Sequence, residues 1–192
     1  MLKYIVIIGA IVELAGKYIY IKDTLKGNTK PNKVTWLLWG IAPIIATFAA
    51  LSAGVRWAVL PIFATGLGCL IVFVVSFLNP KSYWKLEKLD YFCGICSILA
   101  LILWAITKEP IIAIIFSIAS DGFASLPTVI KSWKYPETES GLTYVASLFN
   151  SLTSFFALKT LTFSELAFPV YLTIICSLLV ISNYKKLFKS KK

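Results

Sequence analysis

Seven apolar segments of about twenty residues each, separated by short gaps that carry lysine, run through the whole sequence. A stretch of this length with few charges is typical of a membrane-crossing helix, because about 20 helical residues span the hydrocarbon core. Composition agrees, since 58% of the 192 residues are hydrophobic and 15% are charged, against roughly a quarter charged in soluble domains. We therefore expect an all-α membrane protein with seven transmembrane helices, at residues 4–21, 34–53, 57–78, 89–106, 110–130, 142–161 and 163–182.

The first segment has an alternative interpretation as a signal peptide, because Lys3 precedes an apolar run. The run contains Glu13 and Lys17 and lacks a clear small-x-small cleavage site, so we interpret it as the first membrane helix. With seven spans, the two ends of the chain lie on opposite sides of the membrane.

Positive residues fall unevenly on the two sides of these spans. Four lie on one side, and fourteen lie on the other: Lys22, Lys26, Lys30, Lys33, Lys81, Lys85, Lys88, Lys131, Lys134, Lys185, Lys186, Lys189, Lys191 and Lys192. Because Lys and Arg in short loops prefer the cytoplasmic side, the bias predicts an N-terminus outside and a C-terminus in the cytoplasm. Membrane topology then explains most of the net charge of +10, and lipid-headgroup recognition is the alternative explanation. No nucleic-acid partner is expected. Eighteen lysines against one arginine indicate an AT-rich genome, so we expect a prokaryotic plasma membrane.

A single constant shift along the chain superposes the first three segments on the last three without a gap. The matched pairs include Pro61 with Pro169, Thr65 with Thr173, and Glu13 with Asp121. Duplicated bundles are common in transporters. We predict a triple-helix bundle in residues 1–80, a linker helix in 81–108, and a second triple-helix bundle with a basic cytoplasmic tail in 109–192. Because the linker is a single helix, both bundles have the same orientation, as two parallel bundles in a 3+1+3 arrangement.

Residues 125–133, of sequence SLPTVIKSW, precede a helix start of sequence SGLT at 140–143. This pattern resembles the PQ-loop signature, in which Pro-Gln near the cytoplasmic end of a bundle's first helix precedes a basic loop and a Gly-Leu-Ser helix start. Thr128 stands where the family has Gln. The chain thus resembles a divergent member of the PQ-loop/SWEET-like (MtN3-type) transporter superfamily. The resemblance implies a transporter that moves a small polar solute, such as a sugar, nucleoside or amino-acid-like compound, by alternating access.

Three charged residues lie near the centres of predicted membrane helices: Glu13 and Lys17 in the first, and Asp121 in the fifth. A carboxylate at that depth costs at least ~2.5 kcal/mol, so it must face a cavity, the bundle interior or a partner. We expect all three residues in a solute or ion pathway, where two acids suit proton coupling or recognition of a cationic group. The alternative is structural, because Glu13 and Lys17 are four residues apart on one helix face and can neutralise each other.

One face of the sixth predicted helix is polar over three turns, with Thr143, Ser147, Asn150, Ser151 and Ser154 in one narrow arc. The arc predicts a polar wall of the pathway, and hydrogen bonding between helices is the alternative. The corresponding face of the second helix carries Trp39, whose ring suits either stacking on a solute or anchoring at the membrane interface. For its neighbour Trp36 we expect the interfacial position.

Pro43 and Pro127 lie within predicted helices, where a proline frees a backbone carbonyl and permits a kink. We expect both to act as hinges between access states. The motif Cys93-x-x-Cys96 falls on an apolar helix without a βαβ context, so we interpret it as core packing rather than as a redox site.

Histidine is absent and only four cysteines occur, which argues against zinc, haem and Ser-His-Asp sites. We expect no metal, no cofactor and no enzymatic activity. The expected partners are a small-molecule solute and the lipid bilayer, with a homo-oligomer left open. The alternative function is a non-transporting seven-helix receptor or assembly factor on the same fold, although the short outer loops disfavour a receptor for a large cargo.

Overall fold

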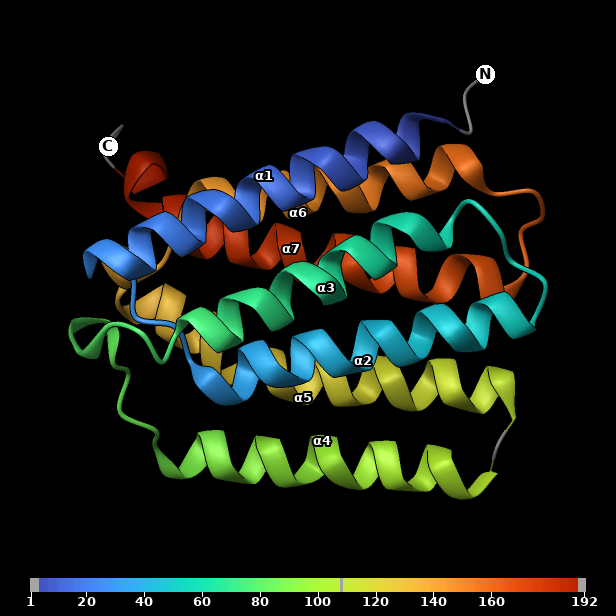
Figure 1. The fold of residues 1–192 in the computed structure, drawn as a ribbon, viewed down its shortest axis with the longest axis horizontal. Helices are drawn as coiled ribbons and strands as arrows, with labels where there is room; N and C mark the ends of the chain where they lie inside the picture. Colours follow the sequence, from blue (N-terminus) through green and yellow to red (C-terminus); the bar gives the residue numbers. More distant parts are fainter. Residues whose placement is uncertain (1–3, 108, 190–192) are drawn as a thin grey trace.

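The computed structural model describes residues 4–107 and 109–189. Within these ranges the chain forms seven α-helices and no strand, as Figure 1 shows, so the predicted all-α class is confirmed. The helices are α1 (Ile5–Lys26), α2 (Lys33–Ser52), α3 (Val59–Val75), α4 (Lys88–Thr107), α5 (Pro110–Lys134), α6 (Gly141–Thr153) and α7 (Phe163–Lys189). Three short 3-10 helices connect them: η2 (Pro80–Ser82), η3 (Pro136–Thr138) and η4 (Ser154–Ala157).

Four of the helices, α2, α4, α5 and α7, are long and apolar enough to cross a membrane. Helix α3 is apolar but has only 17 residues. Helix α1 carries Glu13 and Lys17 at its centre, and α6 has 13 residues, which keeps both out of this group. Length and composition therefore support membrane crossing for four helices, whereas the sequence predicts seven spans.

Several helices end elsewhere than the sequence predicts: α3 stops at Val75, and α5 and α7 run on to Lys134 and Lys189. Helix α1 extends past residue 21 to Lys26 and stops where Gly27 has φ 82°, the left-handed conformation that glycine adopts readily at a helix C-terminus. Helix α6 stops at Thr153, and the chain tightens into η4. Beyond η4, the Glu165 carboxylate accepts two backbone N–H groups of the loop before α7, at 2.8 and 2.9 Å, so this loop replaces the predicted last helical turn.

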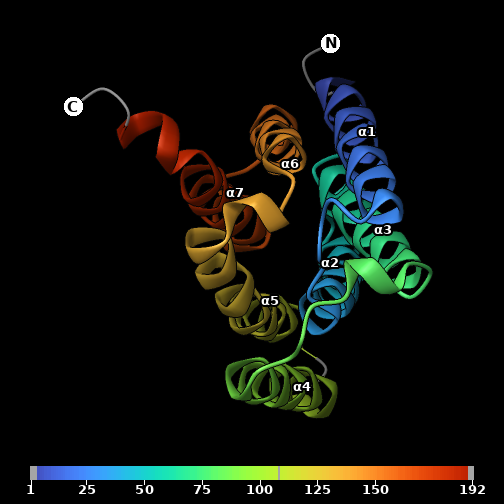
Figure 2. The ribbon, with the colours of Figure 1, turned by 90° about the vertical axis from the view of Figure 1, so that its left-hand side faces the viewer.

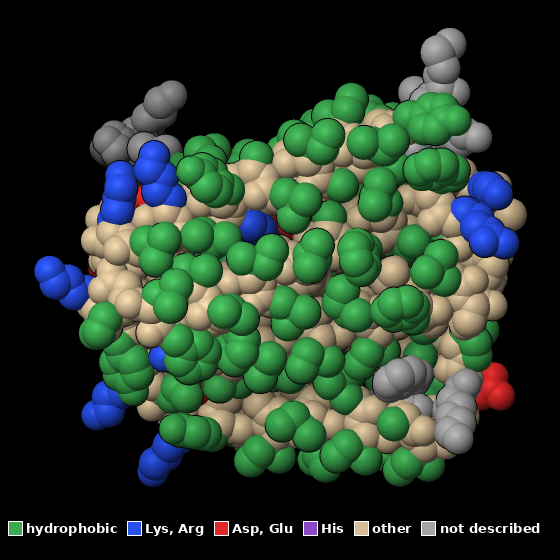
Figure 3. Space-filling model, in the orientation of Figure 1, with side chains coloured by type: hydrophobic (Ala, Val, Ile, Leu, Met, Phe, Trp, Pro, Cys, Tyr) green, Lys and Arg blue, Asp and Glu red, His purple; other side chains and the backbone are tan. Residues whose placement is uncertain are grey.

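Large apolar side chains cover much of the molecular surface, while Lys and Arg gather toward two opposite ends (Figure 3). The outer face of α4 is the clearest case, with six exposed side chains over three turns: Tyr91, Phe92, Ile95, Ile98, Leu99 and Ile102. Exposed apolar surface of this extent is rare on soluble monomers and is typical of a surface that contacts lipid or another protein.

The helices form two groups with the same internal packing. Helix α3 packs against both α1 and α2, and α7 packs against both α5 and α6. Figure 2 shows α1–α3 on one side of the molecule, α5–α7 on the other, and α4 below α2 and α5. The groups meet where α1 packs on α6 and where α2 packs on α5. Each group therefore contributes two helices to the contact between them.

Helix ends and hydrogen bonds follow the same register that pairs Pro61 with Pro169 in the sequence. Helices α1 and α5 end at the equivalent residues Lys26 and Lys134, and α2 and α6 also begin at equivalent positions. Two hydrogen bonds between the groups are equivalent in this register. Thr35 Oγ1 donates to the Ala124 carbonyl at 2.8 Å, and Thr143 Oγ1 donates to the Gly16 carbonyl at 2.9 Å. The contact between α2 and α5 thus has the same local chemistry as the contact between α6 and α1.

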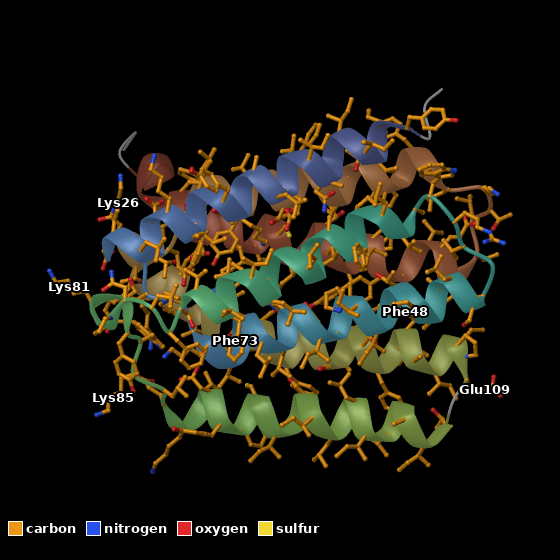
Figure 4. All side chains as sticks on the ribbon, in the orientation of Figure 1. Lys26, Phe48, Phe73, Lys81, Lys85 and Glu109 are labelled. Atoms are coloured by element: carbon orange, nitrogen blue, oxygen red, sulfur yellow. The ribbon has the colours of Figure 1, made fainter. Side chains whose placement is uncertain are left out.

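Three loops, at residues 27–32, 76–87 and 135–140, lie together at one end of the molecule, which we name the lysine-rich end. Figure 4 labels Lys26, Lys81 and Lys85 at this end, and Glu109 at the opposite end, which we name the far end. The lysine-rich end thus collects residues that are distant in sequence.

Some of the lysines behind the predicted charge bias lie outside the described part of the chain. Lys3, Lys108, Lys191 and Lys192 lie outside the described residues, and so do the side chains of Lys186 and Lys189. The basic tail predicted at the C-terminus therefore stays a prediction.

A row of four aromatic side chains runs through the core: Tyr20, Trp36, Trp39 and Tyr144. Successive ring centroids are 4.5, 5.4 and 6.5 Å apart. Because Trp36 is 0% exposed, the expectation that it sits at the membrane interface is wrong. Tyr20 packs on Trp36 and Tyr144 packs on Trp39, and both tyrosines come from other helices, so the pattern along α2 carries no sign of them.

Candidate functional site

A small buried cavity lies between the two groups of helices, and we name it the central cavity. Its volume is about 30 Å³, enough for a water molecule and too small for an organic solute. Every helix except α4 contributes to its lining: Lys17, Trp39, Thr65, Cys69, Asp121, Tyr144, Ser147, Leu172, Ile175, Cys176 and Leu179. Four of the residues predicted for the pathway therefore meet in one place: Lys17, Trp39, Asp121 and Ser147.

Glu13 and Lys17 form a buried ion pair on α1, the alternative that their spacing allows. Lys17 Nζ lies 3.0 Å from Glu13 Oε1, and the two residues are 4% and 0% exposed. Lys17 also donates to Ser147 Oγ on α6 at 3.3 Å. The stem of Lys17 passes over Gly68 of α3, where a Cβ atom would lie 2.6 Å from Lys17 Cγ. Glu13 is thus neutralised at the edge of the cavity, while Lys17 reaches into it.

Asp121 of α5 has a side-chain partner on another helix, α7. Its Oδ2 accepts a hydrogen bond from the Tyr171 hydroxyl of α7 at 2.6 Å. Among the described residues, no cation lies within ion-pair distance of the carboxylate. Lys17 and Asp121 therefore line the same cavity without forming an ion pair with each other.

Two aromatic side chains form the walls of the central cavity at its lysine-rich side. Trp39 is buried, and its Nε1 donates to Ser125 Oγ at 2.8 Å, which fixes the indole against α5. Tyr144 crosses Trp39 edge to face, with an angle of 86° between the rings. The cavity thus combines apolar aromatic faces with the charged groups of Lys17 and Asp121.

The polar arc on α6 divides between cavity and helix contacts. Ser147 lines the central cavity, and Asn150, Ser151 and Ser154 do not. Asn150 Nδ2 donates to the Pro61 carbonyl at 3.0 Å and to Thr65 Oγ1 at 3.1 Å, both on α3. Beyond Ser147, the arc therefore serves the alternative role, which is hydrogen bonding between helices.

Ser151 and Ser154 complete this arc. Ser151 accepts a hydrogen bond from Thr173 Oγ1 of α7 at 3.1 Å. Ser154 is fully buried at the start of η4, and its hydroxyl has no hydrogen-bond partner within the described part of the chain. Both serines are buried against protein and neither lines the cavity, so neither contributes to the pathway wall that the arc predicts.

The predicted hinge residues Pro43 and Pro127 both lie inside helices, α2 and α5, and both are buried. Helices α2 and α5 pack against each other across the contact between the two groups. The two prolines therefore stand on the pair of helices that would move relative to each other, and their hinge role stays a prediction.

A second ion pair, which the sequence pattern does not single out, lies at the lysine-rich end. Lys131 Nζ of α5 lies 2.5 Å from Glu139 Oε1, in the loop before α6, and both side chains are buried. Glu139 Oε2 accepts hydrogen bonds from the hydroxyls of Tyr20 at 2.9 Å and Tyr144 at 2.6 Å. Sequence spacing could not find this cluster, because Lys131 belongs to a lysine bias that topology alone explains and Glu139 lies outside the apolar helices.

The cysteines are unpaired thiols. Cys93 is buried on α4 and Cys96 is partly exposed, which agrees with the predicted packing role of this motif. Cys69 and Cys176 both line the central cavity. Within residues 4–107 and 109–189, no group of three Cys, Asp or Glu residues is arranged to hold a metal ion.

Searches of protein-family models, curated proteins and solved structures return no match to this chain. The function must therefore be argued from the central cavity and its surroundings.

Proposed function

We propose that this chain is an integral membrane transporter that moves a small polar solute by alternating access. The observation that carries the proposal is the central cavity, a buried and charged space enclosed jointly by the two groups of helices. Ionisable groups at this depth are costly and mark a solute or ion pathway in membrane proteins by default. The side chains that we assign to this pathway are Lys17, Trp39, Asp121 and Ser147, with Glu13 as the counter-ion of Lys17.

We infer the architecture of the PQ-loop/SWEET-like superfamily that the loop motif resembles. It consists of two parallel triple-helix bundles, in residues 1–80 and 109–192, joined by a linker helix in 81–108. The repeated packing of α3 and α7 supports this arrangement, and so does the pair of equivalent hydrogen bonds from Thr35 and Thr143. Helix α4 packs on the outside of α2 and α5, as a linker does.

Alternating access follows from the way the cavity is enclosed. At about 30 Å³ it holds no organic solute, so the structure corresponds to a closed state and transport requires the cavity to enlarge. Rocking of one bundle against the other at the α1–α6 and α2–α5 contacts would open it toward one end at a time. Pro43 and Pro127 are the hinges in this proposal.

The ionised side chains at the cavity leave one negative charge uncompensated, so one added positive charge would be favourable. Glu13 and Lys17 compensate each other, whereas Asp121 accepts a hydrogen bond from the Tyr171 hydroxyl and has no cation as a partner among the described residues. A proton on Asp121 or a cationic group on the solute would supply the missing charge. Proton coupling and a solute with a basic group are therefore both open to this site.

We place the lysine-rich end in the cytoplasm and the far end outside. The support is the lysine bias, since Lys26, Lys81 and Lys85 lie together at one end of the molecule. In this orientation the N-terminus is outside, and any cytoplasmic release of solute passes the ion pair of Lys131 and Glu139.

Counterflow in proteoliposomes tests the proposal. Vesicles with the purified protein are loaded with a sugar, nucleoside or amino acid, and uptake of the labelled compound is followed with and without a proton gradient. We expect uptake of at least one compound above that of protein-free vesicles, and loss of any pH dependence in Asp121→Asn. Glu165→Gln is the matched control, because it alters a buried carboxylate that caps a loop far from the cavity. A folded protein that moves no compound would favour the receptor or assembly factor.

A further inference from the structure

The ion pair of Lys131 and Glu139 joins parts of the chain that belong to both groups of helices. We propose that it is a latch that holds the pathway closed at the lysine-rich end and that must open when the central cavity opens toward that end. The purpose of the latch rests on the proposed transport function, but its existence can be tested without a known solute.

Burial and hydrogen bonding make the ion pair of Lys131 and Glu139 a strong local contact. The two residues are 3% and 7% exposed, and the carboxylate of Glu139 uses both oxygens, one for Lys131 and one for the two tyrosine hydroxyls. Lys131 Nζ also lies 4.6 Å from the centroid of the Trp84 ring. A buried charge without its partner is strongly unfavourable, so these contacts form and break together.

The latch crosses the contact between the two groups. Lys131 and Glu139 belong to α5 and the loop that follows it, whereas Tyr20 belongs to α1. Lys131 Nζ also donates to the carbonyl of Lys30, in the loop between α1 and α2, and the Lys30 N–H donates to the Thr138 carbonyl at 3.0 Å. Separation of the two groups at this end therefore requires all of these contacts to break.

The position of the latch fits a barrier between two spaces. Tyr144, which donates to Glu139, also lines the central cavity. Lys131 lines a second cavity of about 70 Å³ at the lysine-rich end, together with Trp84, Lys134 and other residues. A polar chain thus runs from the central cavity through Tyr144, Glu139 and Lys131 to the second cavity.

The far end is closed in a different way. There, α2 meets α5 through Ala49, Ala113 and Ile114, and α1 meets η4 through Val6 and Ala157. Within the described part of the chain, the ion pairs are those of Lys17 with Glu13 and Lys131 with Glu139, so none lies at the far end. Apolar contacts suffice to close a helix bundle, and the presence of a buried charged tie at one end alone points to a barrier that opens selectively.

Two native thiols report on the latch. A Cys93→Ser/Cys96→Ser background leaves Cys69 and Cys176, both buried against the central cavity. Right-side-out and inside-out vesicles are treated with a small, cationic, membrane-impermeant methanethiosulfonate, and the labelling rate is measured for each face. We expect slow labelling from the lysine-rich face in the background protein and labelling about tenfold faster in Glu139→Gln, because loss of the carboxylate charge strands Lys131.

The controls separate a latch from a general loss of structure. Glu165→Gln, at the opposite end, should label as the background does from the lysine-rich face. Tyr20→Phe removes a single hydroxyl that crosses between the groups and should give an intermediate rate, which keeps the test valid if Glu139→Gln does not purify as a folded protein. The proposal is overturned if the tested latch variants label at the background rate, or if their labelling rises equally from both faces. A protein that shows the expected labelling yet moves no solute would refute transport and retain the latch.

Discussion

At the scale of single residues, the central cavity holds two kinds of buried charge. Glu13 and Lys17 form a compensated pair that is also tied to Ser147, while Asp121 relies on one tyrosine hydroxyl. The pair repays its loss of hydration only when both members are present, because a lone buried charge costs several kcal/mol. Asp121 lacks such compensation, which makes it the residue whose charge state is most open to change by a proton or solute.

The compensated pair predicts strong coupling between its members. Glu13→Gln and Lys17→Met should each lower the free energy of unfolding by about 3–5 kcal/mol, because each strands the other charge. The double variant should lose less than the sum of the two, and the unfolding of detergent-solubilised protein measures all four states of the cycle. Additive losses would show that the two side chains do not compensate each other.

A methyl group added at Gly68 should clash with a neighbouring side chain, whereas one added at Gly122 should not. Gly68→Ala places a methyl group 2.6 Å from Lys17 Cγ and should destabilise the protein by about 1–3 kcal/mol, as overpacking does. Gly122→Ala is the matched control on α5, because its methyl group would meet Tyr171 at 3.9 Å, an ordinary contact. The control should be neutral or up to about 1 kcal/mol more stable, since Ala favours helix over Gly. Thermal unfolding compares the two, and equal effects would contradict the tight passage of Lys17 over α3.

At the scale of helices, the sequence predicts that each helix forms better than it predicts which residues that helix contacts. The apolar blocks predict all seven helices because each is longer than a globular strand and is bounded by polar residues. The pattern does not foresee the early end of α6 or the burial of Trp36, because both depend on other helices. The arc on α6 identifies a face that meets protein, but cavity and helix contacts use the same residue types, so the arc alone does not separate Ser147 from Asn150.

Asn150 therefore predicts a loss of stability rather than of solute recognition. Asn150→Leu removes the hydrogen bonds to α3 and leaves polar groups of Pro61 and Thr65 with fewer partners, which should cost about 1–3 kcal/mol. Ser147→Ala, one turn away and facing the cavity, is the comparison and should alter counterflow more than unfolding. A stable Asn150→Leu variant without counterflow would show that Asn150 acts in the solute pathway.

At the scale of the whole molecule, two similar groups of helices enclose one cavity and meet through different contacts at their two ends. The register between the two halves is visible in the sequence because Pro61 and Pro169 survive at equivalent positions, and the helix ends and the bonds of Thr35 and Thr143 follow it. The cavity lining was only partly foreseeable. Charged residues stand out in an apolar helix, whereas Cys69 and Cys176 look like ordinary packing until their neighbours are known.

Alternating access requires that the central cavity be reachable from each side of the membrane in turn. The most direct measurement is the labelling of Cys69 and Cys176 by an impermeant thiol reagent, with Cys93 and Cys96 replaced by Ser and the latch intact, in vesicles of both orientations. We expect slow but measurable labelling from each face, reduced by any compound that shows counterflow. Folded protein whose two thiols react from neither face, or from one face alone, would contradict it.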